Sequence, residues 1–264
     1  MPVLRHRLTV FFSLKAPGCS GLQVVGEHAP YPIRSYVLRP GRITAGQAQA
    51  LEKYWGKYGI EFSQDLLDLD LVFNRSAPRI LEIGAGMGEV SMALAKKHPE
   101  NDYLAIEVHR AGIGSLIRQA ASAKLGNIRV ICHDVVEILK QQIPDRSLDE
   151  VYIFFPDPWP KKRHHKRRLI SPELVTLLCR KLKCHARLFI ATDWQDLAEH
   201  VLDVCDSVPG LINLAGQGHY APRANWRPLT KFEQRGRKLG HQVWDFAYGL
   251  APVTDRLLAA QTRE

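Results

Sequence analysis

From residue 79 onward, the sequence alternates between short apolar segments and segments with helical spacing. The apolar segments are 79–84, 102–108, 127–134, 149–156 and 187–193, followed by 210–216 and 242–250 on either side of a basic loop, 220–240. The segments with helical spacing are 89–98, 111–126, 135–143 and 171–183. A helix that joins two neighbouring strands makes them parallel. The pattern therefore predicts an α/β fold, with a mainly parallel seven-stranded sheet and helices on both faces.

A carboxylate stands at the end of each of the first four strands. The four residues are Glu82, Glu107, Asp134 and Asp157, separated by 25, 27 and 23 residues. The carboxyl ends of parallel strands meet at one edge of an open sheet, and ligands bind there. We expect these four side chains to share one binding site.

The turn after the first strand, EIGAGMGE at 82–89, indicates what this site binds. Gly84, Gly86 and Gly88 allow a tight turn, but Glu89 stands where a dinucleotide fingerprint needs glycine, and no Gly-Lys-Ser/Thr follows. Several carboxylates would also repel a pyrophosphate. S-adenosylmethionine, with its cationic centres and ribose hydroxyls, fits better. We expect Glu107 to accept from the ribose hydroxyls and Asp134 from the adenine amine.

The fourth acid precedes a dense basic run, within FFPDPWPKKRHHKRR at 154–168. Asp157 lies between Pro156 and Pro158, where the transferred methyl group is expected, and residues 161–168 are all basic. Such a run is commonly a solvated face, but this one is tethered between a strand end and a helix. Together with the net charge of +9, it favours a nucleic acid whose phosphates it would contact.

Cysteine usage and the N-terminal region set further limits. No two of the five cysteines form a Cys-x-x-Cys pair, so the sequence predicts no disulfide framework, no metal site and a reducing cytoplasm. No apolar run is long enough to span a membrane. Residues 4–15 could imitate a short signal or transit peptide, but we favour a disordered N-terminal extension over 1–32 and one domain over 33–264.

The domain over 33–264 begins with an arginine-rich arm, which is followed by a helix that starts with a Thr44–Gln47 capping-box pattern. Leu51, Tyr54, Trp55 and Tyr58 of this helix are expected to be core residues rather than a ligand cage.

Six segments between about residues 33 and 250 carry a family resemblance. They read IRSYVLRPGR, LEIGAGMGE, AIEVHR, FFPDPWPKKRHHKRR, ATDW and NWRPLTKFEQRGRKLGH. On these segments the chain resembles the bacterial tRNA (guanine-N7)-methyltransferases, which are class I S-adenosylmethionine-dependent methyltransferases. The resemblance implies a Rossmann-like, doubly wound fold. It also implies methyl transfer from S-adenosylmethionine to guanine N7 in the variable loop of tRNA, by a cytoplasmic monomer or homodimer.

The resemblance also implies roles for individual residues, in agreement with the reasoning from strand ends. Asp157 is the expected catalytic residue. The expected cofactor-binding residues are Glu82, Gly84, Gly86, Gly88, Glu107, Asp134 and Asp157. The expected substrate-binding residues are Lys161, Asp193, Thr230, Lys231, Phe232 and Glu233. The expected RNA contacts are Arg163, His164, His165, Lys166, Arg167 and Arg168.

Several alternatives remain open from the sequence. Asp193 could be a helix cap instead of a second acceptor for guanine, and Phe232 could be a core residue instead of a stacking platform. Methylation of an exocyclic amine is the nearest enzymatic alternative, although the usual Asp-Pro-Pro-aromatic signature is replaced by DPWP. A non-catalytic RNA-binding subunit is the alternative of another class, and the four intact strand-end acids argue against it.

Overall fold

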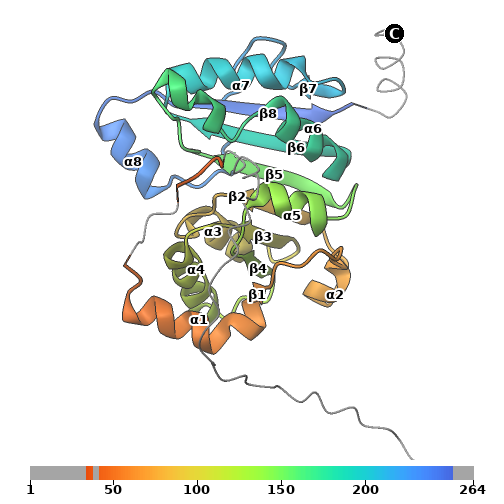
Figure 1. Ribbon diagram of the computed structural model, residues 1–264, viewed down its shortest axis with the longest axis vertical. Coiled ribbons are helices and arrows are strands. Elements are labelled where there is room, and N and C mark those ends of the chain that lie inside the picture. The colour runs from red at the N-terminus through yellow and green to blue at the C-terminus, as the bar shows by residue number, and fades with distance from the viewer. Residues whose placement is uncertain (1–33, 38–41, 252–264) are drawn as a thin grey trace, which may run out of the picture. The chain divides into compact units, whose positions relative to one another are not determined.

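The structure is built on one eight-stranded sheet with helices packed against both faces (Figure 1). This computed structural model describes residues 34–37 and 42–251. The strands are β1 (Gly59–Ile60), β2 (Arg79–Ile83), β3 (Asp102–Ile106), β4 (Ile128–Ile131), β5 (Leu148–Phe154), β6 (Leu182–Thr192), β7 (Leu211–Asn213) and β8 (Trp244–Leu250). All the predicted strands are present, but the predicted total was one too low. β1 has only two residues, which is too short to give a sequence pattern, and it pairs parallel with β4 at the edge of the sheet.

The order of the strands places a binding crevice at the centre of the sheet. The order is β1-β4-β3-β2-β5-β6-β8-β7. Pairing is parallel from β1 to β6, and β8 is antiparallel to both of its neighbours. The chain winds from β2 through β3 to β4 on one side, and then crosses to β5 on the other side of β2. This reversal between β2 and β5 is the topological switch point at which ligands bind in doubly wound sheets.

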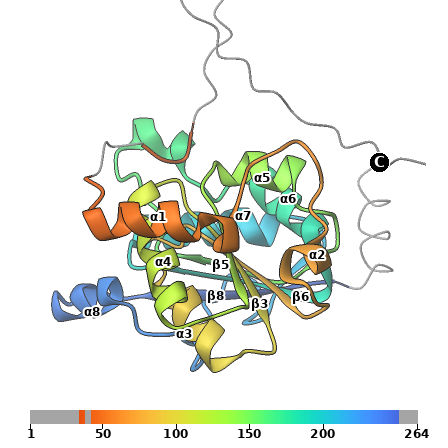
Figure 2. The ribbon, with the colours of Figure 1, turned by 90° about the horizontal axis from the view of Figure 1, so that it is seen from below.

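The helices divide between the two faces of the sheet (Figures 1 and 2). They are α1 (Ala45–Tyr58), α2 (Leu69–Phe73), α3 (Glu89–Lys97), α4 (Arg110–Ser122), α5 (Val135–Gln141), the 3-10 helix η1 (Lys162–Arg167), α6 (Pro172–Lys181), α7 (Gln195–Ser207) and α8 (Lys231–Lys238). α1, α3 and α4 pack on one face, and α5, α6 and α7 pack on the other. Each face has its own hydrophobic core.

Strand β2 shows how the alternation of side chains serves these two cores. Leu81 and Ile83 belong to the core with α5, α6 and α7, whereas Ile80 belongs to the core with α1, α3 and α4. All five residues of β2 are buried, as expected for a central parallel strand covered on both sides. The same alternation directs Glu82 toward α3.

The N-terminal helix was predicted correctly. Thr44 and Gln47 form the complete capping box of α1, and Leu51 and Tyr58 are buried against α4 and the sheet. The aromatic stripe is therefore part of the core, as expected. The extension expected over 1–32 lies outside the described residues and stays a prediction.

The interpretation of 220–240 as a loop was wrong for its second half, because Lys231–Lys238 forms α8. The segment reads KFEQRGRK and has no apolar repeat that would indicate a helix. Its start was readable in principle. Thr230 is the N-cap, and its hydroxyl accepts a hydrogen bond from the backbone of Glu233 at 3.1 Å.

Candidate functional site

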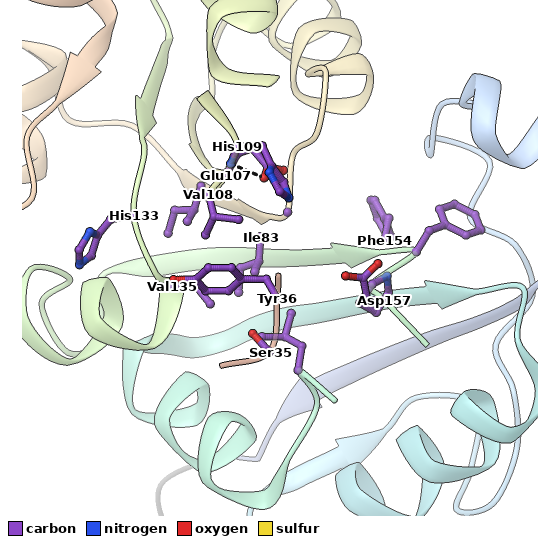
Figure 3. A pocket seen from close by; sticks show the side chains of 15 residues that line it. Ser35, Tyr36, Ile83, Glu107, Val108, His109, His133, Val135, Phe154 and Asp157 are labelled. Carbon is purple, nitrogen blue, oxygen red and sulfur yellow. Dashed lines mark hydrogen bonds between the residues drawn. The ribbon is translucent and has the colours of Figure 1, made fainter. Parts of the chain in front are cut away.

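A pocket of about 210 Å³ opens at the carboxyl ends of the central strands (Figure 3). Gly84 lines it after β2, Glu107 after β3, and Asp157 after β5. Ser35 and Tyr36 of the N-terminal arm complete its wall. Three of the predicted site residues therefore meet at the expected edge of the sheet.

The glycine-rich turn after β2 needs its glycines. Gly84, Gly86 and Gly88 have φ angles of 75°, 54° and 83°, in the left-handed region that other residues rarely adopt. A Cβ atom on Gly88 would also lie 2.6 Å from Cγ of Leu116 in α4. The turn therefore brings the backbone to the pocket and leaves room for the packing of α4.

Glu107 joins this turn to the end of β3. One oxygen of its carboxylate accepts a hydrogen bond from the backbone N–H of Gly86 at 2.8 Å, and the other accepts from His109 at 2.9 Å. The residue is 7% exposed and lines the pocket. Each carboxylate oxygen can accept a further hydrogen bond, so Glu107 can also bind a pair of ligand hydroxyls.

Glu82 has a different environment from the other acids. It is buried and does not line the pocket; its carboxylate accepts hydrogen bonds from the hydroxyl of Ser91 and, at 3.0 Å, from the Ser91 backbone. Gly88, the N-cap of α3, has no side chain to bind the first-turn N–H groups, so Glu82 does this instead. Burial raises the pKa of Glu82 to about 7, although the bonds from Ser91 oppose the rise. The cofactor contact expected of Glu82 stays a prediction.

Asp134 caps the helix that follows its strand. Its side chain accepts a hydrogen bond from the backbone of Val136 at 2.8 Å, at the start of α5. Its neighbours His133 and Val135 line the pocket, whereas Asp134 does not. The His133 ring stacks on Phe62 with 3.8 Å between ring centroids. The adenine contact expected of Asp134 stays a prediction.

Asp157 lies in the loop after β5, exposed at the mouth of the pocket. Phe155 and Trp159, on either side of it, have φ angles of 54° and 48°. A left-handed backbone costs a non-glycine residue about 1–3 kcal/mol, and such residues cluster at functional sites. An exposed carboxylate on a constrained loop can accept hydrogen bonds from a base and can offset a positive charge that develops beside it.

The basic run continues directly from this loop as η1. Lys161, Lys162, Arg163 and Lys166 are exposed, so their charges are available to phosphates. The other members of the run have partners within the protein. The Arg167 guanidinium lies 5.3 Å from the ring centroid of Trp159, His164 meets the same ring edge-on, and His165 lies 3.6 Å from Asp196.

Arg168 is placed differently from the rest of the run. Its side chain is 3% exposed and forms an ion pair with Asp196. It also donates a hydrogen bond to the backbone oxygen of Pro158 at 3.2 Å. In this arrangement Arg168 anchors η1 and the Asp157 loop. We had expected its guanidinium to contact RNA, but in this structure it faces Asp196 and Pro158 instead of the solvent.

The remaining predicted substrate residues lie on α8 or beside it. Lys231 and Phe232 are exposed, and the Phe232 ring lies 5.2 Å from the ring of Phe155 at the pocket. Glu233 is buried and accepts hydrogen bonds from Arg223, Arg227 and Arg237. Burial alone would raise the pKa of Glu233, but the bonds and charges of Arg223 and Arg227 outweigh it and lower the pKa. The structure thus places Phe232 near the pocket and Glu233 inside the protein.

Asp193 follows β6 and pairs with His241 at 3.1 Å. It does not cap α7, because the N-cap of that helix is Trp194, which makes no capping bond through its side chain. The alternative in which Asp193 is a helix cap is therefore wrong. Its substrate role stays a prediction.

Two residues at the site were missed from the sequence. Tyr36 lines the pocket opposite Glu107 (Figure 3), and burial raises the pKa of its phenol. The arm that carries it is held by a hydrogen bond of 3.1 Å from the Trp159 indole to the backbone oxygen of Ser35. Gly112 of α4 is the other: a Cβ there would lie 2.3 Å from the backbone oxygen of Gly86. Tyr36 lies in the segment IRSYVLRPGR that carries the family resemblance, but no pattern there indicates a pocket residue, and Gly112 has no local signal, since each contact joins distant segments.

Over 34–37 and 42–251, no group of three or more His, Cys, Asp or Glu side chains could hold a metal ion. Over the same residues, no helix has the length and apolar character needed to cross a bilayer.

Comparisons with known proteins agree with this geometry. Residues 76–246 match the family described as putative methyltransferase. A tRNA (guanine-N(7)-)-methyltransferase of Nitrosospira multiformis is 55% identical over 84% of this chain and 96% of its own length. The enzyme of the same name from Escherichia coli is 51% identical over 82% of this chain and 90% of its own. Among solved structures, the 16S rRNA methyltransferase KamB has a TM-score of 0.51 at 14% identity, over 71% of this chain and 95% of its own, which supports the fold.

Proposed function

The chain belongs to the tRNA (guanine-N(7)-)-methyltransferase family, and from this premise we propose that it transfers a methyl group from S-adenosylmethionine to N7 of a guanine in tRNA. The observation that carries the proposal is the convergence of Gly84, Glu107 and Asp157 on one pocket, with the basic helix η1 continuing from the Asp157 loop. Since the substrate is tRNA, we infer that the protein acts in the cytoplasm.

The residues of the pocket fit the proposed methyl donor. Glu107 lines the pocket, its pair of oxygens can accept from ribose hydroxyls, and Ile83, Ile106 and Val135 provide apolar wall. When bound, S-adenosylmethionine supplies a methyl group activated by a positively charged sulfonium. The buried carboxylate of Glu107 gives the pocket the negative charge that a cationic ligand requires.

The chemistry on the side of the acceptor requires little from the protein. Guanine N7 has an in-plane lone pair, so no side chain has to remove a proton before the attack. Alignment and electrostatics should then provide most of the rate. Asp157 is placed to accept hydrogen bonds from the edge of the guanine ring and to offset the positive charge that develops on it.

The phosphate backbone is held separately from the base. Lys161, Lys162, Arg163 and Lys166 are exposed next to the Asp157 loop. Cations at this place bind phosphates without regard to sequence, whereas the pocket selects the base. The tRNA would therefore be positioned by η1, with the guanine at Asp157.

The proposal is tested by identifying the methylated nucleoside. Purified protein, tRNA and S-adenosylmethionine should give N7-methylguanosine after digestion of the tRNA to nucleosides. Methyl on an exocyclic amine would favour the amine alternative. If the protein binds tRNA and transfers no methyl group, the chain is an RNA-binding module and the proposal is wrong.

Asp157→Asn tests the catalytic role within this function. The amide keeps the size of the side chain but cannot offset a positive charge, so we predict that methyl transfer slows by about 10²-fold, equivalent to about 2.7 kcal/mol. The Kd of the cofactor should stay near normal. Asp65→Asn, at an exposed position away from the pocket, is the matched control. A fully active Asp157→Asn would remove the catalytic role.

A further inference from the structure

The direction of the Asp157 side chain is set by its backbone. Within the part of the chain that the structure describes, no group donates a hydrogen bond to the Asp157 carboxylate. Two residues earlier, the backbone N–H of Phe155 donates to the oxygen of Ala191 in β6 at 2.7 Å, which extends the pairing of β5 with β6 by one residue. Phe155 then turns the chain with its φ angle of 54°. Whatever holds Phe155 in this conformation also aims Asp157.

A buried charged group, Arg227, lies beside this turn, with its guanidinium over the Phe155 ring. Its side chain is 1% exposed. Its guanidinium donates to Asp245 of β8 at 2.9 Å and 3.1 Å, and to Glu233 of α8 at 2.7 Å and 3.3 Å. Two carboxylates thus hold it in one plane, as the planar fork of arginine allows.

Two aromatic rings lie within cation–π distance of the same guanidinium. Its central carbon lies 5.5 Å from the ring centroid of Phe154 and 5.5 Å from that of Phe155. Phe232 of α8 packs on Phe155 from another side. Arg227 therefore links α8, β8 and the end of β5 at the point where the chain turns toward Asp157.

We propose that Arg227 is a positioning residue for methyl transfer: held by Glu233 and Asp245, it fixes Phe155 in its left-handed conformation and so directs Asp157 into the pocket. This inference rests on the proposed function, because it assigns Arg227 a part in that reaction. It also gives Glu233 a role inside the protein, as an anchor for Arg227.

Arg223 offers a matched comparison within the same cluster. Its Nε atom donates to Glu233 at 3.0 Å and its Nη2 atom donates to the backbone oxygen of Arg227 at 2.8 Å, so it stabilises α8 and the backbone that carries Arg227. Among the described residues, however, no aromatic ring lies within cation–π distance of its guanidinium. If the cluster only holds α8 in place, lysine at either position should have the same consequence for catalysis.

The experiment compares Arg227→Lys with Arg223→Lys. Lysine keeps the charge but loses the planar fork and the stacking surface. We expect Arg227→Lys to lower kcat, and the single-turnover rate at saturating tRNA and cofactor, by about tenfold or more. The KM for tRNA and the Kd of the cofactor should stay within about threefold of wild type, because Arg227 is buried and does not line the pocket. Arg223→Lys should keep all four quantities within about threefold, whatever its effect on the midpoint of thermal unfolding.

Two results would overturn the inference. One is a loss of rate in Arg227→Lys no larger than that in Arg223→Lys. The other is a loss of cofactor affinity that accompanies the loss of rate, which would indicate general damage to the pocket. Failure of the proposed function would be seen separately, as wild-type protein that transfers no methyl group to tRNA.

Phe155→Leu keeps the inference testable if Arg227→Lys does not fold. Leucine leaves the ion pairs intact but removes the ring that lies 5.5 Å from the guanidinium carbon. We expect a slower single turnover with cofactor Kd within about threefold of wild type. Where Arg227→Lys folds, adding it to Phe155→Leu should cause no further loss, because both changes break the contact between Arg227 and Phe155. Unchanged turnover in Phe155→Leu, or a loss that comes with a loss of cofactor affinity, would contradict the inference.

Discussion

The carboxylate of Glu107 has two tasks, because it holds the glycine-rich turn and faces the pocket. In Glu107→Gln, the side-chain nitrogen cannot accept from a backbone N–H or a ribose hydroxyl. We predict that cofactor affinity falls by about 1.5–3 kcal/mol, seen as a higher Kd in calorimetric titration. Glu100→Gln, at an exposed position outside the pocket, is the control. An unchanged Kd in Glu107→Gln would show that this carboxylate does not bind the cofactor.

Glu82 should give the stability of the protein a dependence on pH. Burial raises its pKa in the folded protein from 4.5 to about 7. Between these values the folded protein holds a proton that the unfolded chain releases, so the free energy of unfolding falls as pH rises through this window. A rise of this size corresponds to about 3 kcal/mol.

The variant Glu82→Gln removes the titrating group and keeps an oxygen that can accept from Ser91. We predict that its free energy of unfolding, measured in urea without cofactor, changes less between about pH 5 and pH 8 than that of wild type. The difference between the two curves isolates Glu82 from other titrating groups. Parallel curves would contradict the raised pKa.

At the scale of elements, η1 is the part of the basic run that can contact phosphates. Lys162, Arg163 and Lys166 are exposed along it. Replacing all three with alanine should weaken tRNA binding and flatten the plot of log affinity against log salt by roughly one unit per lost contact. Cofactor affinity should not change.

The control removes the same charge from the other edge of the sheet. Lys96 and Lys97 in the last turn of α3 and Lys140 in the last turn of α5 are exposed at the ends of their helices away from the pocket. Their triple alanine variant should keep the wild-type salt slope. If both triple variants change the slope equally, only net charge matters, and η1 has no particular role.

The helix α8 shows why some elements could not be predicted. Its sequence is almost entirely polar, and its place on the protein depends on Glu233 contacting Arg223 and Arg227, which lie six to ten residues away. Glu233 was expected to bind substrate because the motif that contains it resembles the family's. Only the structure shows that both of its oxygens are bonded inside the protein.

For the whole molecule, the main features of the fold could be predicted because they depend on local patterns. Buried parallel strands appear as apolar runs, and the helices between them have caps such as Ser171 before α6. The edge strand β1 had no such pattern, because its two residues are held by pairing with β4.

The site could be predicted as far as it follows from strand order. Gly84, Glu107 and Asp157 meet because their strands are neighbours in a parallel sheet. Tyr36 and Arg227 reach the site from distant segments. Both lie in segments that carry the family resemblance, but no local pattern in those segments indicates a place at the pocket for Tyr36 or beside the Asp157 loop for Arg227. The burial of Arg168 likewise depends on Asp196 of α7, which no count of basic residues could reveal.

The central claim is that this protein methylates guanine N7, and one measurement tests it most directly. Two tRNAs are compared as substrates, identical except that one has 7-deazaguanine at the target nucleotide, where carbon replaces the nucleophilic nitrogen. We predict that both bind with similar Kd and that only the tRNA with guanine accepts a labelled methyl group from S-adenosylmethionine. Methyl incorporation at the 7-deazaguanine nucleotide would contradict the account, because the methyl group would then be going to another atom.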